Sequence, residues 1–307
     1  MKRVLLLAAV LLCAAPAHAY VQSTNSAGHP MSWSTHGHSI QIDAQGSQAA
    51  GTTAVFDAIR KSFATWAAVS CSDLSFSEES LSTDPKARVI GFFPNQTNHN
   101  LVLFRSRSCQ QVAPAGDPCF ASGGCDNVYD CFDENLKPGV IATTTTTTNR
   151  NTGEIIDTDT EFNEAPNTTD GSHFIFTAID GPPCAGAGDT GCVQFDVQNT
   201  MTHEAGHTLG LDHTQDPRAT MFATSPSGET SKRVLGQDDI NGICAIYPKG
   251  AGSGGGCDSS PAQTGPGAAL CALLFLLEIR RRSRRKPQLA MTRSVASAKA
   301  ARFQGES

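Results

Sequence analysis

The sequence predicts an α+β fold: a twisted mixed sheet with two long helices above a cleft, and a smaller, loop-rich C-terminal part. Short segments that alternate apolar and polar residues, or are rich in β-branched residues, predict the strands. Residues 53–68 carry apolar side chains at helical spacing and predict the first helix. A second helix should begin near Asp196, a favoured N-cap residue type. A closing helix is expected within residues 235–248, capped by Asp238 or Asp239.

Most of the predicted strands lie in the first half of the chain. Residues 39–43 alternate apolar and polar side chains and predict the first strand. Residues 74–76, 89–92 and 101–104 are short candidates for further strands. The helix at residues 53–68 has one strongly apolar face, so we expect it to pack against the sheet that these strands form.

A run of six threonines occupies positions 143–148, within the segment 139–148. Such a run can be low-complexity sequence, but threonine is β-branched and favours strands. A turn at residues 151–153 and a second strand at residues 155–162 make a β-hairpin the preferred interpretation. Exposed threonines also suit an edge strand, which can pair with an extended peptide through its main chain.

Three carboxylates alternate along the second strand of this hairpin. Asp157, Asp159 and Glu161 therefore share one side of the strand. They could form a Ca²⁺ site, because carboxylate oxygens are the ligands that calcium prefers. They could also be a solvated face. The solvated face is the preferred interpretation, and Ca²⁺ stays as the alternative.

Residues 203–213 read His-Glu-Ala-Gly-His-Thr-Leu-Gly-Leu-Asp-His. Histidines at i and i+4 lie on one face of a helix, so His203 and His207 can bind one metal ion. Gly210 tolerates the positive φ with which a helix can stop abruptly, and the turn would bring His213 to the same ion. Three imidazoles with the fourth position left open are typical of catalytic zinc, whereas structural zinc sites have four protein ligands.

Glu204 directly follows the first of these histidines. It lies about a quarter-turn further round the predicted helix, so its carboxylate need not bind the metal. From there it can reach a water molecule that the metal activates. A site that held zinc only for stability would not need this carboxylate.

The segment 203–213 resembles the long zinc-binding signature of the metzincin metalloproteases. Thr214 and Met221 narrow the resemblance to the matrixins, in which serine or threonine follows the third histidine and a methionine eight residues beyond it forms a turn beneath the metal. Residues 153–163 resemble the matrixin strand that precedes the active-site helix, and residues 235–248 resemble the closing helix of that domain.

This resemblance implies a zinc endopeptidase with Zn²⁺ as its cofactor. It implies Glu204 as the general base, His203, His207 and His213 as the zinc ligands, and Met221 as the apolar floor of the site. Three features depart from the family. No cysteine-containing pro-segment of the matrixin kind precedes the domain, so the sequence does not predict latency by a cysteine switch. The second, structural zinc site has no match, and Phe222-Ala223 follows Met221 without the proline often found two positions on. The wall of the specificity pocket is therefore not predicted.

Cysteine usage indicates an oxidising compartment. The predicted domain, residues 20–249, holds eight cysteines: Cys71, Cys109, Cys119, Cys125, Cys131, Cys184, Cys192 and Cys244. An even number suggests four disulfides, and eight cysteines allow 105 pairings. We expect Cys184 to pair with Cys192, because they bracket a short glycine-rich loop. Residues 109–131 contain four of the eight and little periodicity, which predicts a disulfide-stapled loop.

Both ends of the chain predict export. Residues 1–19 combine a basic start, twelve apolar residues and Ala17-His18-Ala19, as in a secretory signal peptide. Residues 250–267 form a Gly/Ser/Pro linker, and residues 268–307 hold a ten-residue apolar run followed by a basic cluster. With Cys257, this end resembles the C-terminal sorting tails of secreted myxobacterial proteins and predicts attachment to a membrane or cell surface. A plain apolar patch with a basic tail is the alternative.

The charge distribution excludes one class of partner. Residues 20–277 hold 12 Lys and Arg against 27 Asp and Glu, a formal charge of −15, whereas the last thirty residues carry +7. An acidic body repels phosphate, so a nucleic acid is not expected as a partner.

From the zinc motif, the cysteines and both ends of the chain together, we expect a secreted, extracellular endopeptidase that binds a protein or peptide substrate in an extended conformation. The alternative is a surface adhesion or binding module that retains a structural zinc.

Overall fold

The computed structural model describes residues 20–84, 88–133, 139–167, 171–186 and 188–250. The predicted signal peptide, linker and tail lie outside these residues and stay predictions. Among the described residues, no helix is both long and apolar enough to cross a bilayer.

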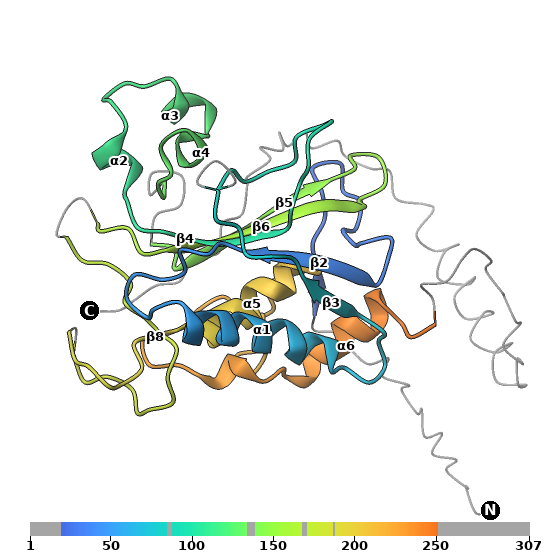
Figure 1. The fold of residues 1–307 in the computed structure, drawn as a ribbon. Helices are drawn as coiled ribbons and strands as arrows, with labels where there is room; N and C mark the ends of the chain where they lie inside the picture. Colours follow the sequence, from blue (N-terminus) through green and yellow to red (C-terminus); the bar gives the residue numbers. More distant parts are fainter. Residues whose placement is uncertain (1–19, 85–87, 134–138, 168–170, 187, 251–307) are drawn as a thin grey trace, which may run out of the picture. The chain divides into compact units, whose positions relative to one another are not determined.

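A five-stranded sheet lies at the centre of the fold, in the order β3-β2-β4-β6-β5 (Figure 1). The strands are β2 (Gly37–Ile42), β3 (Ser75–Glu78), β4 (Leu101–Arg105), β5 (Ala142–Thr148) and β6 (Ile155–Asn163). Strands β3, β2, β4 and β6 are parallel, and β5 pairs with β6 in the antiparallel sense. The sheet is mixed, as predicted, and the threonine run forms its edge strand.

One predicted strand is wrong. Residues 89–92 form no strand, because side chains bind their backbone groups in place of a neighbouring strand. The amide of Ile90 donates to Asn127 Oδ1 at 2.8 Å, and its carbonyl accepts from Asn127 Nδ2 at 2.9 Å. The amide of Gly91 donates to Asp159 Oδ2 at 2.5 Å. Two further pairs of short strands were not predicted: β1 (Val21–Gln22) with β9 (Leu211–Asp212), and β7 (Phe176–Thr177) with β8 (Phe195–Asp196).

The two long helices, α1 (Thr53–Ala67) and α5 (Val197–Thr208), lie together on one face of the sheet (Figure 1). Trp66 of α1 and Met201 of α5 are fully buried in their shared core. The indole of Trp66 also donates to the carbonyl of Thr202 at 2.8 Å. This bond satisfies the polar atom of a buried aromatic ring and joins the two helices.

The closing helix, α6 (Gln237–Ile246), follows the 3₁₀ turn η2 (Ser231–Arg233). The expected N-cap is wrong in position: the N-cap residue is Gly236, whose amide donates to Asp239 Oδ2 at 2.8 Å. The cap side chain therefore comes from the first turn of the helix. A disulfide between Cys71 and Cys244 joins α6 to the segment that follows α1.

All eight cysteines of the domain are paired, as predicted, and Cys184 bonds to Cys192. The cysteine-rich segment is more ordered than a loop, because three short helices form in it: α2 (Cys109–Val112), α3 (Cys119–Ser122) and α4 (Cys125–Tyr129). Disulfides Cys109–Cys131 and Cys119–Cys125 form a small core between them. These helices lie on the other side of the sheet from α1 and α5 (Figure 1).

Buried charges join this cysteine-rich unit to the sheet. Arg105 of β4 has no exposed surface and pairs with Glu161 of β6 at 2.9 Å and with Asp130 at 2.5 Å. Arg88 pairs with the same Asp130 at 2.9 Å and with Asp43. Burial alone would raise the pKa of Asp130, but the two guanidinium groups lower it.

The solvated face expected on β6 is wrong. Asp157, Asp159 and Glu161 are 2%, 1% and 0% exposed. Asp159 accepts the amides of Gly91 and Leu101, which explains how an acidic residue is tolerated in the interior. Burial and the nearby charge of Asp157 raise the pKa of Asp159. In the described part of the chain, these three carboxylates do not form a group with the spacing of ligands to one metal ion, and Ca²⁺ binding stays a prediction.

We expect Arg105→Met to lower the free energy of unfolding by about 3–5 kcal/mol, because it removes the buried cation that pairs with Glu161 and one of the two guanidinium groups that pair with Asp130. Urea unfolding followed by tryptophan fluorescence measures this loss. Arg218→Met is the matched control: Arg218 is 86% exposed and pairs with Asp216 at the surface, so its loss should cost less than about 1 kcal/mol. Equal effects of the two substitutions would contradict a structural role for the buried network.

Candidate metal centre

Helix α5 places His203 and His207 one turn apart. It ends at Thr208, so that the chain can turn and bring His213 back to the same two histidines. Its N-cap is Asp196, as predicted, and Asp196 Oδ1 accepts the amide of Asn199 at 2.6 Å. Beyond its C-terminus, Gly210 has a φ of +83°. A Cβ atom there would lie 2.4 Å from the carbonyl oxygen of Met31. Glycine is therefore required for both its conformation and its lack of a side chain.

The turn at Gly210 brings the three predicted imidazoles together. His213 Nε2 lies 3.2 Å from His203 Nε2 and 3.2 Å from His207 Nε2. Two ligand nitrogens of a tetrahedral zinc, each about 2.0–2.1 Å from the ion, are roughly 3.3 Å apart. Among the described residues, these three histidines form the group with spacing suitable for one metal ion. The residues present therefore fit a zinc ion.

Backbone carbonyls orient two of the rings. His203 Nδ1 lies 2.7 Å from the carbonyl oxygen of Thr220, and His207 Nδ1 lies 2.8 Å from that of Leu211. A carbonyl only accepts, so each Nδ1 carries the hydrogen and each Nε2 presents its lone pair in the neutral ring. Burial lowers the pKa of His203 and keeps it neutral. Lone pairs that face one another at this distance favour a cation between them.

Glu204 lies on the same helix and is completely buried. Its Oε2 accepts a hydrogen bond of 2.8 Å from the hydroxyl of Thr144 on β5. Its Oε1 is buried and has no hydrogen-bond partner among the described residues. Burial raises the pKa of Glu204, although the hydrogen bond from Thr144 acts in the opposite direction. A carboxylate with one oxygen held and the other unpartnered can take up and release a proton.

Met221 lies in the turn that follows the third histidine. The amide of Thr214 donates to the carbonyl of Met221 at 3.0 Å, which closes the turn. Met221 is 2% exposed, and its sulfur lies 2.2 Å from where a Cβ atom on Gly206 would stand. Asp239 holds this turn, accepting the amides of Thr220 at 2.7 Å and Met221 at 3.0 Å.

Three contributors to this centre were missed at the level of sequence. Gly206 is a glycine inside a helical pattern, a signal that usually has a packing reason. The sequence predicts Asp238 or Asp239 as a helix cap, but it carries no signal for the second role of Asp239 at the turn. Thr144 is one of six consecutive threonines, and periodicity alone does not indicate which of them reaches a particular side chain.

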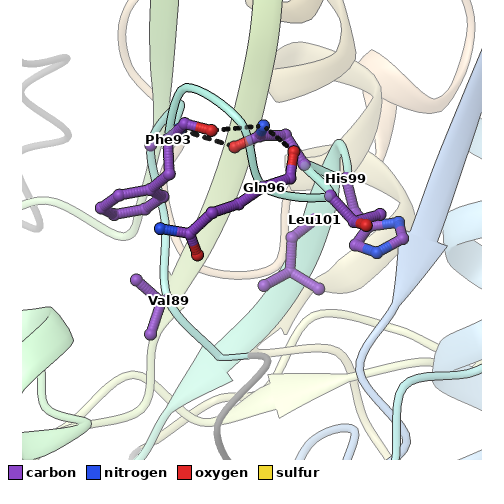
Figure 2. Close-up of a pocket in the computed structure, with 8 residues that line it drawn as sticks. Val89, Phe93, Gln96, His99 and Leu101 are labelled. Carbon is purple, nitrogen blue, oxygen red and sulfur yellow. Dashed lines mark hydrogen bonds between the residues drawn. The ribbon is translucent and has the colours of Figure 1, made fainter.

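A separate pocket of about 270 Å³ lies beside the start of β4 (Figure 2). Eight residues of one continuous stretch line it: Val89, Gly91, Phe93, Gln96, Thr97, Asn98, His99 and Leu101. Asn98 fixes the loop by hydrogen bonds with Phe93 and Gln96. His99 is the titratable residue among those that line the pocket, and it forms a hydrogen bond with Glu79. No residue of α5 contributes to this pocket, and we assign it no chemistry.

Comparison with protein families matches residues 119–248 to the matrixin model. The match includes β5, β6, α5, the turn at Met221 and α6. Every residue of the three-histidine centre therefore lies inside the matched region, as do Glu204 and Thr144.

Individual relatives match shorter stretches. Human neutrophil collagenase is 41% identical over 95 residues, which are 26% of this chain and 19% of the relative. Human matrilysin is 46% identical over 52 residues, 17% of this chain and 20% of the relative. Metalloendoproteinase 1 of Glycine max is 47% identical over 53 residues, 17% of each chain. The aligned residues span about a fifth of the length of these relatives.

We expect Gly210→Ala to destabilise the protein more than the same change at an unconfined glycine. Both Gly210 and Gly116 have a positive φ, so alanine costs about 1–2 kcal/mol at either position. Nothing lies within 4 Å of a Cβ at Gly116, whereas Gly210 faces the Met31 carbonyl. The overlap should add about 1–3 kcal/mol, measured as the difference between urea unfolding curves. An equal loss in both variants would mean that the close approach at Gly210 is unimportant.

Proposed function

We propose that this chain is a matrixin-like metzincin and acts as a zinc-dependent endopeptidase. The observation that carries the proposal is the convergence of three imidazole nitrogens, with His213 Nε2 3.2 Å from each of the other two, beside a buried glutamate with one unpartnered oxygen. We assign His203, His207 and His213 as the zinc ligands and Glu204 as the general base. A bound zinc would act as a Lewis acid, polarising the peptide carbonyl and acidifying a water molecule.

Glu204 would move the proton that hydrolysis requires. Its unpartnered Oε1 would take a proton from the attacking water and deliver it to the nitrogen of the leaving amine. The buried position supports this role, because burial raises the pKa of the carboxyl group and so makes the carboxylate a stronger proton acceptor.

The edge strand β5 would bind the substrate. β5 pairs with β6 on its inner side, and among the described residues no strand pairs with its outer side. An extended peptide could add there as a further strand, using main-chain hydrogen bonds.

We assign Met221 as the apolar floor below the histidines, as in the Met-turn of metzincins, since its buried sulfur packs against Gly206 of α5.

We further propose that the protein is secreted. The predicted signal peptide at residues 1–19 supports this, and so do the four disulfides, which persist in an oxidising compartment. Attachment to a membrane or cell surface through residues 268–307 is a separate proposal. Mass spectrometry of the exported protein tests it, and an intact C-terminus at Ser307 in the medium would reject a sorting signal.

Glu204→Gln should lower kcat/KM for an unfolded protein substrate by about 10²–10⁴-fold, because the amide cannot accept the proton. Zinc content should stay at that of the wild type, since Glu204 is not a proposed ligand. Proteolysis assays together with metal analysis measure the two effects. If wild type and Glu204→Gln are equally inert with zinc bound, the enzyme proposal fails and a binding module with structural zinc becomes the better account.

Removal of zinc by a chelator should abolish proteolysis and lower the midpoint of thermal unfolding. Zinc at 100 times its Kd stabilises a folded protein by about 2.7 kcal/mol, equivalent to roughly 5–10 °C for a domain of this size. Differential scanning calorimetry of the stripped and reloaded protein measures the shift, with Mg²⁺ as the control ion. Unchanged activity after complete zinc removal would overturn the cofactor assignment.

A further inference from the structure

We propose that Thr144 is a positioning residue that holds the Glu204 carboxylate in its working orientation. This inference rests on the proposed function of Glu204 as general base. Thr144 lies on the edge strand β5 and Glu204 on helix α5, 60 residues later in the chain. Their contact is therefore a product of the tertiary fold.

The Thr144 hydroxyl has three neighbours with oxygen atoms. Its Oγ1 lies 2.8 Å from Glu204 Oε2, 3.0 Å from Thr160 Oγ1 and 3.3 Å from the Glu204 carbonyl. Thr160 stands directly opposite Thr144 in the β5–β6 register and is 2% exposed. The shortest of the three contacts is the one to the carboxylate.

The chemistry of these groups fixes the direction of the hydrogen bonds. An ionised carboxylate only accepts, so the single hydrogen of Thr144 points to Glu204 Oε2. In that arrangement Thr144 accepts at its own oxygen, and Thr160 is placed to donate to it. A hydrogen bond to a charged acceptor is stronger than one between neutral groups, so this contact restrains the carboxylate.

The restraint makes the two carboxylate oxygens unequal. Oε2 is occupied by the hydroxyl of Thr144, whereas Oε1 has no hydrogen-bond partner among the described residues. Oε1 is then the oxygen that receives a proton, and the Thr144 bond sets the plane in which it lies. A peptide bound along β5 would pair with the strand that carries Thr144. The same strand would therefore position both the scissile bond of the peptide and Oε1 of Glu204.

The test compares Thr144→Val with Thr144→Ser in the full-length, zinc-loaded protein. Valine keeps the shape of threonine and removes the donor, whereas serine keeps the donor. We expect Thr144→Val to lower kcat about 10- to 100-fold with KM changed less than about 2-fold, and Thr144→Ser to restore most of kcat. Thr158→Val is the matched control, because this buried β6 hydroxyl bonds to Asn100 and should leave kcat unchanged.

Crystal structures of the same zinc-loaded variants supply a readout independent of activity. The Glu204 carboxylate should rotate away from its wild-type plane in Thr144→Val and keep that plane in Thr144→Ser, with equal zinc content in both. Should Thr144→Val not fold, Thr144→Ala takes its place. An unmoved carboxylate or an unchanged kcat in the valine variant would overturn the inference. If the wild type is inert, the proposed function fails, and the position of the carboxylate alone decides the role of Thr144.

Discussion

The metal centre depends on one constraint: three imidazole nitrogens must meet although one of them comes from beyond the end of the helix. Backbone atoms satisfy this constraint more than side chains do. The positive φ of Gly210 redirects the chain, and the carbonyls of Thr220 and Leu211 fix the rings of His203 and His207. These carbonyls lie in the segments that the turn brings back, so the same turn places the third histidine and orients the first two.

The closing helix holds a second turn beside the centre, the one that contains Thr220 and Met221. Asp239, in the first turn of α6, accepts hydrogen bonds from the amides of Thr220, Met221 and Gly236. Burial raises the pKa of Asp239, and the three amides offset part of that cost. One buried carboxylate thus joins the start of the closing helix to the turn at Thr220 and Met221.

Much of the fold and of the site could be predicted, because it follows from local pattern. The apolar spacing of residues 53–68 predicted α1, and the motif at residues 203–213 predicted which imidazoles converge. The burial of the carboxylates of β6 is not predicted by the sequence. Alternation along a strand indicates which side chains share a face, but it does not indicate which residues cover that face. The burial of these carboxylates depends on Arg105 and on the loop at Gly91, which are remote in sequence. The Thr144–Glu204 contact is non-local in the same way.

The threonine run shows how a uniform sequence can serve two environments. Alternate residues of a strand face opposite sides, and residues paired across two strands share a side. Thr145 therefore faces the side of its partner Asp159, towards the buried charges, whereas Thr144 faces the side of Thr160, towards α5. Threonine suits both sides, since its methyl group packs and its hydroxyl bonds. The hydroxyl of Thr144 forms the hydrogen bond to the Glu204 carboxylate. Six residues of the same type therefore differ in their roles according to their position in the strand.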